Sequence, residues 1–413
     1  MGKVDKLRPD YLAYPRHPHQ ITANLWDPSS NSQAGCLNYP VHRWYFITEG
    51  LPVNFVRQHV RHTKGPVLDP FLGAGTVTVE TKLAGVRATG VDVNPFMCFA
   101  SQVKTRDYQE KEVSTALECI LQADFKFHHV NGEPRELARL KRYYTASTFK
   151  KLQLLRTSIK AISDLALRRL FLLCFVDVAV KVSNMRRTPA PRYVGHPKGP
   201  CKVFREFRSK IERVLEDLRK VGRLDESQWS ADIFRGDSRD LSFLREDYGL
   251  VVTSPPYCNN VDFIRHSQLE LLWLGLAADG DDLGRLRHAA ITSCEAMAHA
   301  NKDEGRLPRR VEMIADKIQH RSNRRYHQVV RQYFVGMAAN IDSTYNVLQR
   351  GGRALYVVGD SWLRGVHVPT HSILNSFALK SGFRKTKVRW LRKRLNGRPH
   401  KLALSEYVIE MTK

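Results

Sequence analysis

The sequence predicts an α/β fold, a doubly wound and mostly parallel sheet with helical insertions. The main observation is an apolar strand at 67–69 that leads into a Gly-x-Gly turn and a helical segment, an arrangement that turns backbone N–H groups toward a ligand. A second strand, at 87–92, ends in an acid, and a third, at 250–253, stops at two consecutive prolines and a tyrosine. Together they predict a ligand site at the carboxyl edge of the sheet.

Charge is the second constraint on function. The chain of 413 residues has 66 Lys and Arg against 41 Asp and Glu, a net charge of +25 at pH 7 and a pI near 9.9. Residues 131–230 alone contain 23 Lys and Arg but only 10 Asp and Glu. An excess of this size predicts a polyanionic partner, for which nucleic acid is the commonest candidate.

The cysteines and the N-terminus bear on the compartment. Seven cysteines occur without a C-x-x-C pair, which predicts reduced thiols and no structural zinc or other metal site. The first residues are charged and lack an apolar run, so no signal peptide is expected. The most apolar window, 165–182, contains four charged residues and is predicted to be a buried helix, with no membrane contact. We expect a cytoplasmic protein, associated with the nucleoid in a prokaryote.

Changes in composition predict the domain organisation. Residues 1–36 form an irregular arm rich in Pro, His, Asn and Ser, and a catalytic domain follows in two pieces, 37–130 and 231–413. Between them, 131–230 is a basic helical insertion with predicted helices at 148–163, 165–182 and 203–221. A second basic helical insertion, 279–331, is a candidate for target recognition.

The second half of the sheet is predicted from shorter signals. Strands are expected at 231–238, 354–358 and 406–411, with a helix at 371–380. Residues 384–401 contain nine Lys and Arg and no Asp or Glu. This segment is either an edge strand protected by its charge or a strip that lies on phosphates.

Six basic residues are candidates for contact with nucleic acid. The loop at 183–200 combines Arg, Pro, Gly and Tyr, a composition that suits phosphate contacts and stacking on an unpaired base, although an ordinary solvated loop explains it equally well. The other candidates lie in the second insertion. The six are Arg186, Arg187, Arg192, Lys198, Arg324 and Arg325.

Taken together, the motifs resemble the S-adenosylmethionine-dependent amino methyltransferases of DNA. The segment 69–76 (DPFLGAGT) is similar to their cofactor motif, 90–95 (GVDVNP) to their ribose-binding strand end, 236–238 (GDS) to their adenine-side turn and 253–257 (TSPPY) to their catalytic motif. The resemblance implies a class I methyltransferase fold, which is Rossmann-like with a seven-stranded sheet, and S-adenosylmethionine as cofactor. In contrast to that family, a long helical insertion separates the ribose strand from Asp237.

The resemblance also implies roles for individual residues. Cofactor binding is expected from Tyr39, Asp69, Phe71, Gly73, Gly75, Thr76, Asp92, Asp237 and Ser238. Catalysis is expected from Ser254, Pro255, Pro256 and Tyr257. In the implied mechanism a base flips out of double-stranded DNA, its amino group donates to Ser254 and to the Pro255 carbonyl, and Tyr257 stacks on its ring. Methyl transfer is then direct, with no covalent enzyme intermediate.

The identity of the base depends on Ser254. In the family, a serine at this position is typical of N4-cytosine enzymes, whereas Asp or Asn is typical of N6-adenine enzymes. Three alternatives stay open: the same chemistry on adenine N6, an RNA substrate, and a non-catalytic subunit that binds nucleic acid. A cognate restriction endonuclease is a further partner that the resemblance implies.

Overall fold

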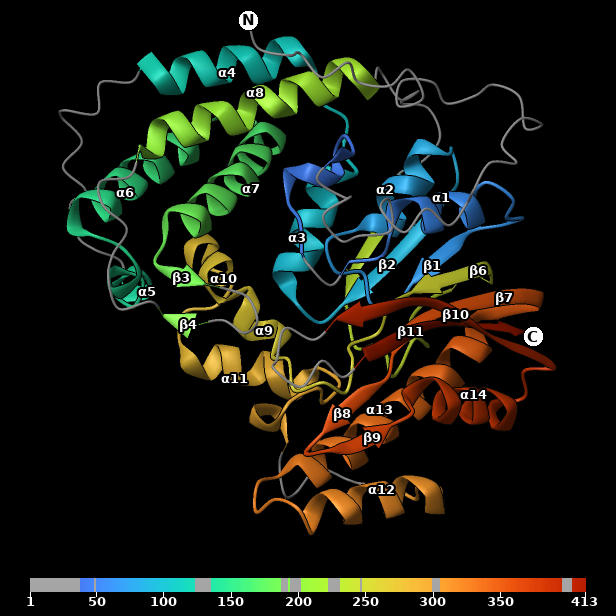
Figure 1. The fold of residues 1–413 in the computed structure, drawn as a ribbon. Helices are drawn as coiled ribbons and strands as arrows, with labels where there is room; N and C mark the ends of the chain where they lie inside the picture. The colour runs from blue at the N-terminus through green and yellow to red at the C-terminus, as the bar shows by residue number, and fades with distance from the viewer. Residues whose placement is uncertain are drawn as a thin grey trace, which may run out of the picture.

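A seven-stranded sheet lies at the centre of the protein (Figure 1). The computed structural model describes residues 38–47, 50–122, 135–186, 192–193, 202–221, 231–245, 247–298, 305–395 and 403–413. The strand order in the sheet is β10-β11-β7-β6-β1-β2-β5. The bounds of these strands are β1 Val67–Asp69, β2 Ala88–Asp92, β5 Ala231–Arg235, β6 Tyr248–Thr253, β7 Leu348–Gly359, β10 Lys385–Leu395 and β11 Ala403–Thr412.

The sheet is parallel except for one strand. β1 pairs in parallel with β2 and β6, β2 with β5, and β6 with β7. β11 is antiparallel to both of its neighbours, β7 and β10. The predicted doubly wound, mostly parallel, seven-stranded sheet is therefore confirmed, and the basic segment after residue 384 forms its edge strand, β10.

Helices cover both faces of the sheet, which explains why the central strands are continuous apolar runs. On one face, α1 (Val53–Val60) and α2 (Thr76–Leu83) pack on Leu250 and Val252 of β6. On the other face, Val251 between them belongs to a core with residues of α13 (Tyr326–Val347) and α14 (Thr370–Ser381). Alternate residues of β6 thus enter two different cores, because successive side chains of a strand point to opposite faces.

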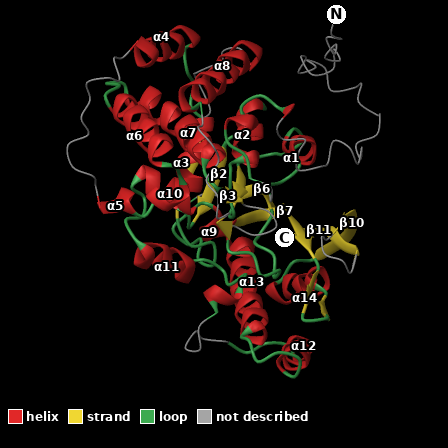
Figure 2. Cartoon of the chain, turned by 60° about the vertical axis from the view of Figure 1, so that its left-hand side comes forward, coloured by secondary structure: helices red, strands yellow, loops and turns green. Residues whose placement is uncertain are grey.

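A layer of long helices adjoins one end of the sheet (Figures 1 and 2). It consists of α4 (Glu110–Gln122), α6 (Ala146–Lys160), α7 (Leu165–Val182) and α8 (Val203–Val221). One apolar cluster joins these helices to α3 (Pro95–Lys104), beside the sheet, and to α10 (Gln268–Leu274). The predicted burial of 165–182 is confirmed, and no helix in the described ranges is long and apolar enough to cross a membrane.

Local sequence explains where several of these helices begin. The side chains of Asn94, Thr145 and Asp164 each accept a hydrogen bond from a backbone N–H in the first turn of α3, α6 and α7, and Pro95 opens α3. These are the residue types that satisfy the unpaired N–H groups at a helix start.

The remaining elements are mostly short. They are η3 (His42–Trp44), α5 (Arg135–Ala138), η4 (Lys141–Tyr143), α9 (Phe263–His266), α11 (Gly280–Ala289), η5 (Glu295–Met297) and α12 (Arg309–Gln319), with two hairpins, β3 (Met185–Arg186) with β4 (Arg192–Tyr193) and β8 (Ser361–Leu363) with β9 (Val366–Val368). The predicted arm at 1–36 lies outside the described residues.

Candidate active site

One pocket of about 390 Å³ lies at the carboxyl edge of the sheet, where four of the predicted motifs meet. Eleven of the thirteen residues predicted for cofactor binding and catalysis line it: Asp69, Phe71, Gly73, Thr76, Asp92, Asp237, Ser238, Ser254, Pro255, Pro256 and Tyr257. They come from the ends of β1, β2, β5 and β6, which are neighbours in the sheet although 184 residues separate Asp69 at the end of β1 from Thr253 at the end of β6. The sheet order brings these motifs together.

Asp92 at the end of β2 is tied to the glycine turn. Its carboxylate accepts hydrogen bonds from Gly73 N and Asn94 N, both at 2.9 Å. Burial raises the pKa of Asp92 to about 6, although these two bonds oppose the shift. Since each carboxylate oxygen has two lone pairs, Asp92 keeps capacity to accept further hydrogen bonds from a ligand.

Asp69 at the end of β1 is a second buried carboxyl group in the pocket. It is 2% exposed, and its Oδ1 accepts from Thr253 Oγ1 at 2.6 Å and from Phe71 N at 3.1 Å. Burial raises the pKa of Asp69 to about 7, and the nearby Asp92 raises it further. Two carboxyl groups with raised pKa values therefore lie in one pocket. A cationic ligand bound there would stabilise their ionised forms.

Gly75 has a different position from the other motif residues, because it does not line the pocket. It is the N-cap of α2 in the left-handed conformation, with φ of 80°, and an added Cβ would lie 2.3 Å from Ser101 Oγ on α3. A glycine is needed here both for the backbone conformation and for the close approach of α3.

We expect Gly75→Ala to lower the free energy of unfolding by about 2–4 kcal/mol, because both the left-handed backbone and the contact with Ser101 become unfavourable. Chemical denaturation checks this, with Gly284→Ala on α11 as control, since an added Cβ there meets nothing within 4 Å. Equal destabilisation by the two substitutions would contradict the role given to Gly75.

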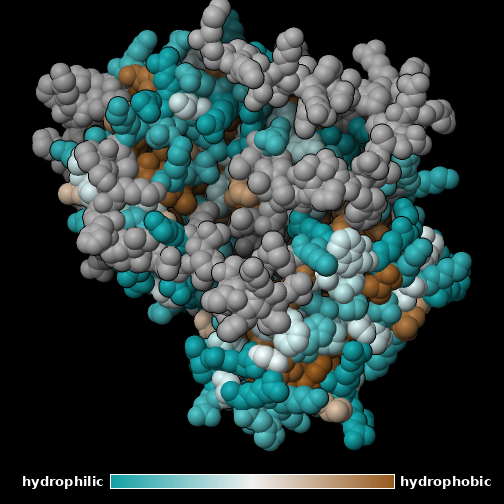
Figure 3. All heavy atoms as spheres, in the orientation of Figure 1, coloured by the Kyte–Doolittle hydropathy of each residue, from teal (hydrophilic) through white to brown (hydrophobic). Residues whose placement is uncertain are grey.

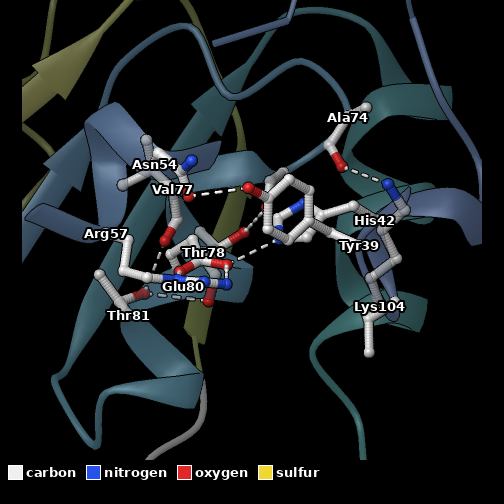
Figure 4. A network of polar contacts seen from close by, with 12 residues as sticks. Tyr39, His42, Asn54, Arg57, Ala74, Val77, Thr78, Glu80, Thr81 and Lys104 are labelled. Carbon is white, nitrogen blue, oxygen red and sulfur yellow. Dashed lines mark hydrogen bonds and ion pairs between the residues drawn. The ribbon is translucent and has the colours of Figure 1, made fainter. Parts of the chain in front are cut away.

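Tyr39 also lies outside the pocket. Its hydroxyl donates to Asn54 Oδ1 at 2.8 Å, and the Arg57 guanidinium lies over its ring at 5.2 Å (Figure 4). The part of the wall expected from Tyr39 is formed instead by the segment that follows it, through Tyr45, Phe46, Ile47, Gly50 and Leu51. This region of the sequence is rich in aromatic residues, but the sequence alone does not indicate which of them face the pocket.

A buried polar network supports the glycine turn from behind (Figure 4). Glu80 of α2 is 1% exposed, lies 2.9 Å from His42 Nε2 and accepts from Arg57 Nε at 2.7 Å. Lys104 of α3 donates to Ala74 O at 2.9 Å and to Tyr45 O. Lys104 thereby joins the turn to the aromatic wall of the pocket.

The TSPPY motif at 253–257 is anchored at both ends. Thr253 bonds Asp69, and the Tyr257 hydroxyl donates to Glu406 Oε1 of β11 at 3.2 Å. Glu406 is 1% exposed and pairs with Arg392 of β10. Just beyond the motif, Asn259 lines the pocket, and its Oδ1 is buried without a hydrogen-bond partner among the described residues. Sequence reasoning missed Asn259, although its place directly after the motif was a usable signal.

Asp237 and Ser238 line the part of the pocket beyond β5. The Asp237 carboxylate accepts from Arg239 Nε at 2.9 Å, and Arg239 also donates to Ala289 O at 3.0 Å. The carbonyl of Ser238 accepts from Asn340 Nδ2 at 2.8 Å. Both residues are therefore held in place by neighbours, and the expected contact of Asp237 with an adenine amino group stays a prediction.

The helical layer also reaches the pocket, through Asp177 of α7. Lys210 of α8 donates to Asp177 Oδ2 at 2.5 Å and to Arg43 O at 3.0 Å. Asp217, also on α8, is fully buried and accepts from Val41 N and Trp44 Nε1, each at 3.0 Å, and from Arg43. The turn that precedes the aromatic wall is thus fixed by the helical layer.

The candidates for nucleic-acid contact fall into two groups. Arg186 is exposed on β3 and pairs in register with Arg192 on β4, whereas Arg187 and Lys198 lie outside the described residues. In the second group, Arg324 forms an ion pair with Glu295, and Arg325 Nη1 donates to Ala298 O at 3.1 Å. Glu295 belongs to the segment 290–297, which also forms part of the pocket wall. The lining residues of this segment are Ala290, Ile291, Ser293 and Met297.

Comparison with known proteins gives the family relationship. No family model matches the chain. It is 23% identical over 353 residues to "Type II methyltransferase M.MvaI" of Kocuria varians, an alignment that covers 78% of this chain and 76% of that protein. This chain is related to type II methyltransferases. It is also 23% identical over 392 residues to M.AvaI of Nostoc sp., covering 84% of this chain and 80% of the relative.

Two further matches are weaker. M.BsoBI of Geobacillus stearothermophilus is 22% identical over 303 residues, which is 62% of this chain and 56% of that relative. Among solved structures, TrmN from Thermus thermophilus is 10% identical, with coverage of 92% of this chain and 53% of TrmN, and its TM-score of 0.28 is too low to support an argument.

The relationship to methyltransferases and the class I strand order imply S-adenosylmethionine as the methyl donor. The pocket fits this molecule, since it combines a glycine turn, the buried carboxyl groups of Asp69 and Asp92, and apolar walls that include Ile47 and Phe71. Among the described residues, no group of three or more His, Cys, Asp or Glu is placed to hold a metal ion.

Proposed function

We propose that this protein is a site-specific DNA methyltransferase that transfers a methyl group from S-adenosylmethionine to the N4 amino group of a flipped-out cytosine. The observation that carries the proposal is the meeting of the TSPPY motif with Asp69, Asp92 and Asp237 in one pocket. Support for DNA comes from the net charge of +25 and from the relationship to type II methyltransferases.

In this proposal, the residues around the glycine turn bind the cofactor. Asp92 accepts from the ribose hydroxyls and Asp237 accepts from the adenine amino group, the roles that carboxylates have in nucleotide-binding folds of this type. Asp69 faces the cationic part of the molecule, which supplies the activated methyl group. Ile47 and Phe71 exclude water from the same pocket.

The residues after β6 hold the target base. The Ser254 side chain and the Pro255 carbonyl accept hydrogen bonds from the amino group and orient its nitrogen lone pair toward the methyl donor. Proline suits position 255 because it has no N–H with which to continue the strand pairing and because its φ is fixed. The ring of Tyr257 stacks on the base, and its bond to Glu406 fixes the plane of the ring.

We expect Tyr257→Ala to lower kcat/KM for DNA by about 10- to 100-fold, since stacking of one base on an aromatic ring contributes about 1–3 kcal/mol. Tyr257→Phe keeps the ring and removes the hydroxyl that bonds Glu406, so its effect on kcat/KM should be much smaller. Steady-state kinetics together with calorimetric titration of S-adenosylmethionine checks this. Similar losses for Ala and Phe, or a parallel loss of cofactor affinity, would contradict the stacking role.

The decisive experiment is transfer of labelled methyl groups to DNA and to RNA, followed by mass spectrometry of the nucleosides. N4-methylcytosine from DNA is the expected product. N6-methyladenine from DNA would instead indicate an adenine-N6 methyltransferase, the second candidate, which differs only in the target base. Methyl transfer to RNA alone would indicate an RNA substrate. Binding of DNA without any transfer would leave a non-catalytic subunit.

Partners and target recognition are part of the same proposal. The basic helical insertion at 131–230, with Arg186 and Arg192, and the second insertion at 279–331, with Arg324 and Arg325, contact the DNA around the flipped base. A cognate restriction endonuclease that recognises the same site is proposed from the relationship to type II enzymes.

A further inference from the structure

The hairpin of β8 and β9 presents two aromatic rings to solvent beside the pocket. Trp362 is 37% exposed and the His367 side chain 44%, and their ring centroids lie 5.1 Å apart at an interplanar angle of 38°. Their neighbours Leu363, Val366 and Val368 are buried in the core under the sheet. The alternation fixes the hairpin to the protein and points one face of it outward. Neither ring lines the pocket.

Several contacts hold this hairpin rigidly. Asp360, which is 4% exposed at the end of β7, lies 3.2 Å from His367 Nε2 and 2.7 Å from His371 Nδ1. The His371 ring stacks on Tyr407 with a centroid distance of 3.9 Å. At the tip, Gly365 O accepts from Arg321 at 2.8 Å. These contacts hold the His367 ring and the hairpin backbone, and the Trp362 ring packs on His367, so the two rings form a partly preorganised surface.

The hairpin and the catalytic motif leave the sheet at the same edge. β6 and β7 are parallel neighbours in which Thr253 pairs with Tyr356, so the motif begins at this pair and the hairpin, at Ser361, follows shortly after it on the adjacent strand. The Tyr257 hydroxyl bonds Glu406, which lies opposite Gly359 in the sheet. The next residue, Tyr407, stacks on His371. A continuous set of contacts thus connects Tyr257 to the hairpin.

Positive charge surrounds the tip of the hairpin. The Arg364 guanidinium lies 4.7 Å from the ring centroid of Tyr326, and Arg324 lies on the same ring at 5.5 Å. Within the described ranges, neither Arg321 nor Arg364 has an acidic partner. In Figure 1 the hairpin lies beside α12 and α13, and Figure 3 shows hydrophilic residues around a smaller hydrophobic patch on this lower part of the same face. Exposed rings next to guanidinium groups that have no acidic partner among the described residues suit base stacking together with phosphate binding.

We propose that Trp362 and His367 form a stacking platform for a nucleobase of the DNA next to the flipped target, with Arg321 and Arg364 on the adjoining phosphates. This inference rests on the proposed function, because it takes the bound polymer to be DNA. A base that loses its stacking neighbour when the target flips out exposes a π face, and an aromatic ring held one strand away from Tyr257 covers such a face. The platform lowers the cost of opening the duplex.

The test measures binding of the full-length protein to fluorescent oligo(dT) of about 20 nucleotides, a probe that exposes unpaired bases. We expect Trp362→Ala to weaken this binding about 10-fold and Trp362→Phe to weaken it much less, since the loss corresponds to one stacked base. Leu379→Ala is the control, because it removes a 53% exposed apolar side chain from α14 and should bind as the wild type does. Circular dichroism confirms that all variants are folded.

Two results would overturn the platform. One is wild-type affinity of Trp362→Ala for oligo(dT), and the other is self-association of the wild type that Trp362→Ala abolishes in sedimentation, which would make the hairpin a contact between copies of the chain. Failure of the proposed function gives a different result. In that case the wild type transfers no methyl group to DNA, while Trp362→Ala still lowers the affinity for oligo(dT).

Discussion

Replacing Asp217 with alanine is expected to lower the free energy of unfolding by about 3–5 kcal/mol, the cost of removing one partner from a buried ion pair. The Asp217 side chain is fully buried and accepts from Val41 N, Arg43 Nε and Trp44 Nε1 at 2.9–3.0 Å. Alanine leaves all three donors without this acceptor. The turn they belong to precedes the aromatic wall of the pocket, so affinity for S-adenosylmethionine should fall as well.

The neighbouring residue provides the control for this prediction. Glu216 also pairs with Arg43, at 2.8 Å, but its side chain is 43% exposed. Glu216→Ala should change the free energy of unfolding by less than about 1 kcal/mol, the usual contribution of an exposed ion pair. Denaturation in urea and calorimetric titration of the cofactor measure both effects. Equal losses for the two substitutions would show that burial of Asp217 does not decide the outcome.

The second large effect is expected from Asp69→Asn, which should stabilise the free protein and impair cofactor binding. Asparagine can still accept from Thr253 and Phe71 N, but it carries no charge in the buried pocket. The pKa of Asp69 is raised to about 7 in the folded protein. The protonated form is therefore favoured by folding, and the stability that it contributes is lost as the pH rises from about 4 through 7.

The difference between Asp69→Asn and the wild type should therefore grow across this pH range. Above pH 7 we expect the variant to be more stable by about 2–4 kcal/mol, whereas near pH 4 the two should be similar. Affinity for S-adenosylmethionine should fall about 10- to 100-fold at pH 8, and that of the wild type should rise between about pH 6 and 8 as the carboxyl group ionises. Thermal denaturation and calorimetry across pH check both results.

Asp232→Asn on β5 is the control for this series, since that side chain is exposed and does not line the pocket. It should leave both the stability profile and cofactor affinity close to those of the wild type. A wild-type affinity that does not change between about pH 6 and 8 would contradict the role given to Asp69.

The strands that hold the motifs could be predicted from the sequence because their signals are local. A glycine turn, a terminal acid and a double proline each mark a strand end, and parallel strands place their carboxyl ends at one edge. Asp69, Asp92 and Ser254 accordingly lie in the same pocket. The long helices at 165–182 and 203–221 were also predictable from local signals, since the first is the most apolar window of the chain and the apolar residues of the second repeat with a helical period.

Contacts between distant segments could not be predicted in this way. Nothing in the sequence indicates that Asp177 lines the pocket or that Asp217 bonds the turn at 41–44, and 176 residues separate Asp217 from Val41. The pocket is lined by Tyr45 and not by Tyr39, because the short helix η3 lies between them and sets the direction in which the chain enters the pocket wall. The hairpin of β8 and β9 has strands of only three residues, too short for a periodic signal.

If the helical layer contacts the target as proposed, the apolar cluster that joins this layer to α3 and α10 limits how its target preference could be changed by engineering. Phe96 of α3 and Trp273 of α10 are fully buried in this cluster together with Phe175 of α7 and Phe207 of α8. A chimera that exchanged the whole layer for that of a relative would have to match these rings, or it would leave cavities and expose them. Substitutions confined to exposed positions such as Arg186 avoid that problem, so a library aimed at altered recognition should begin there.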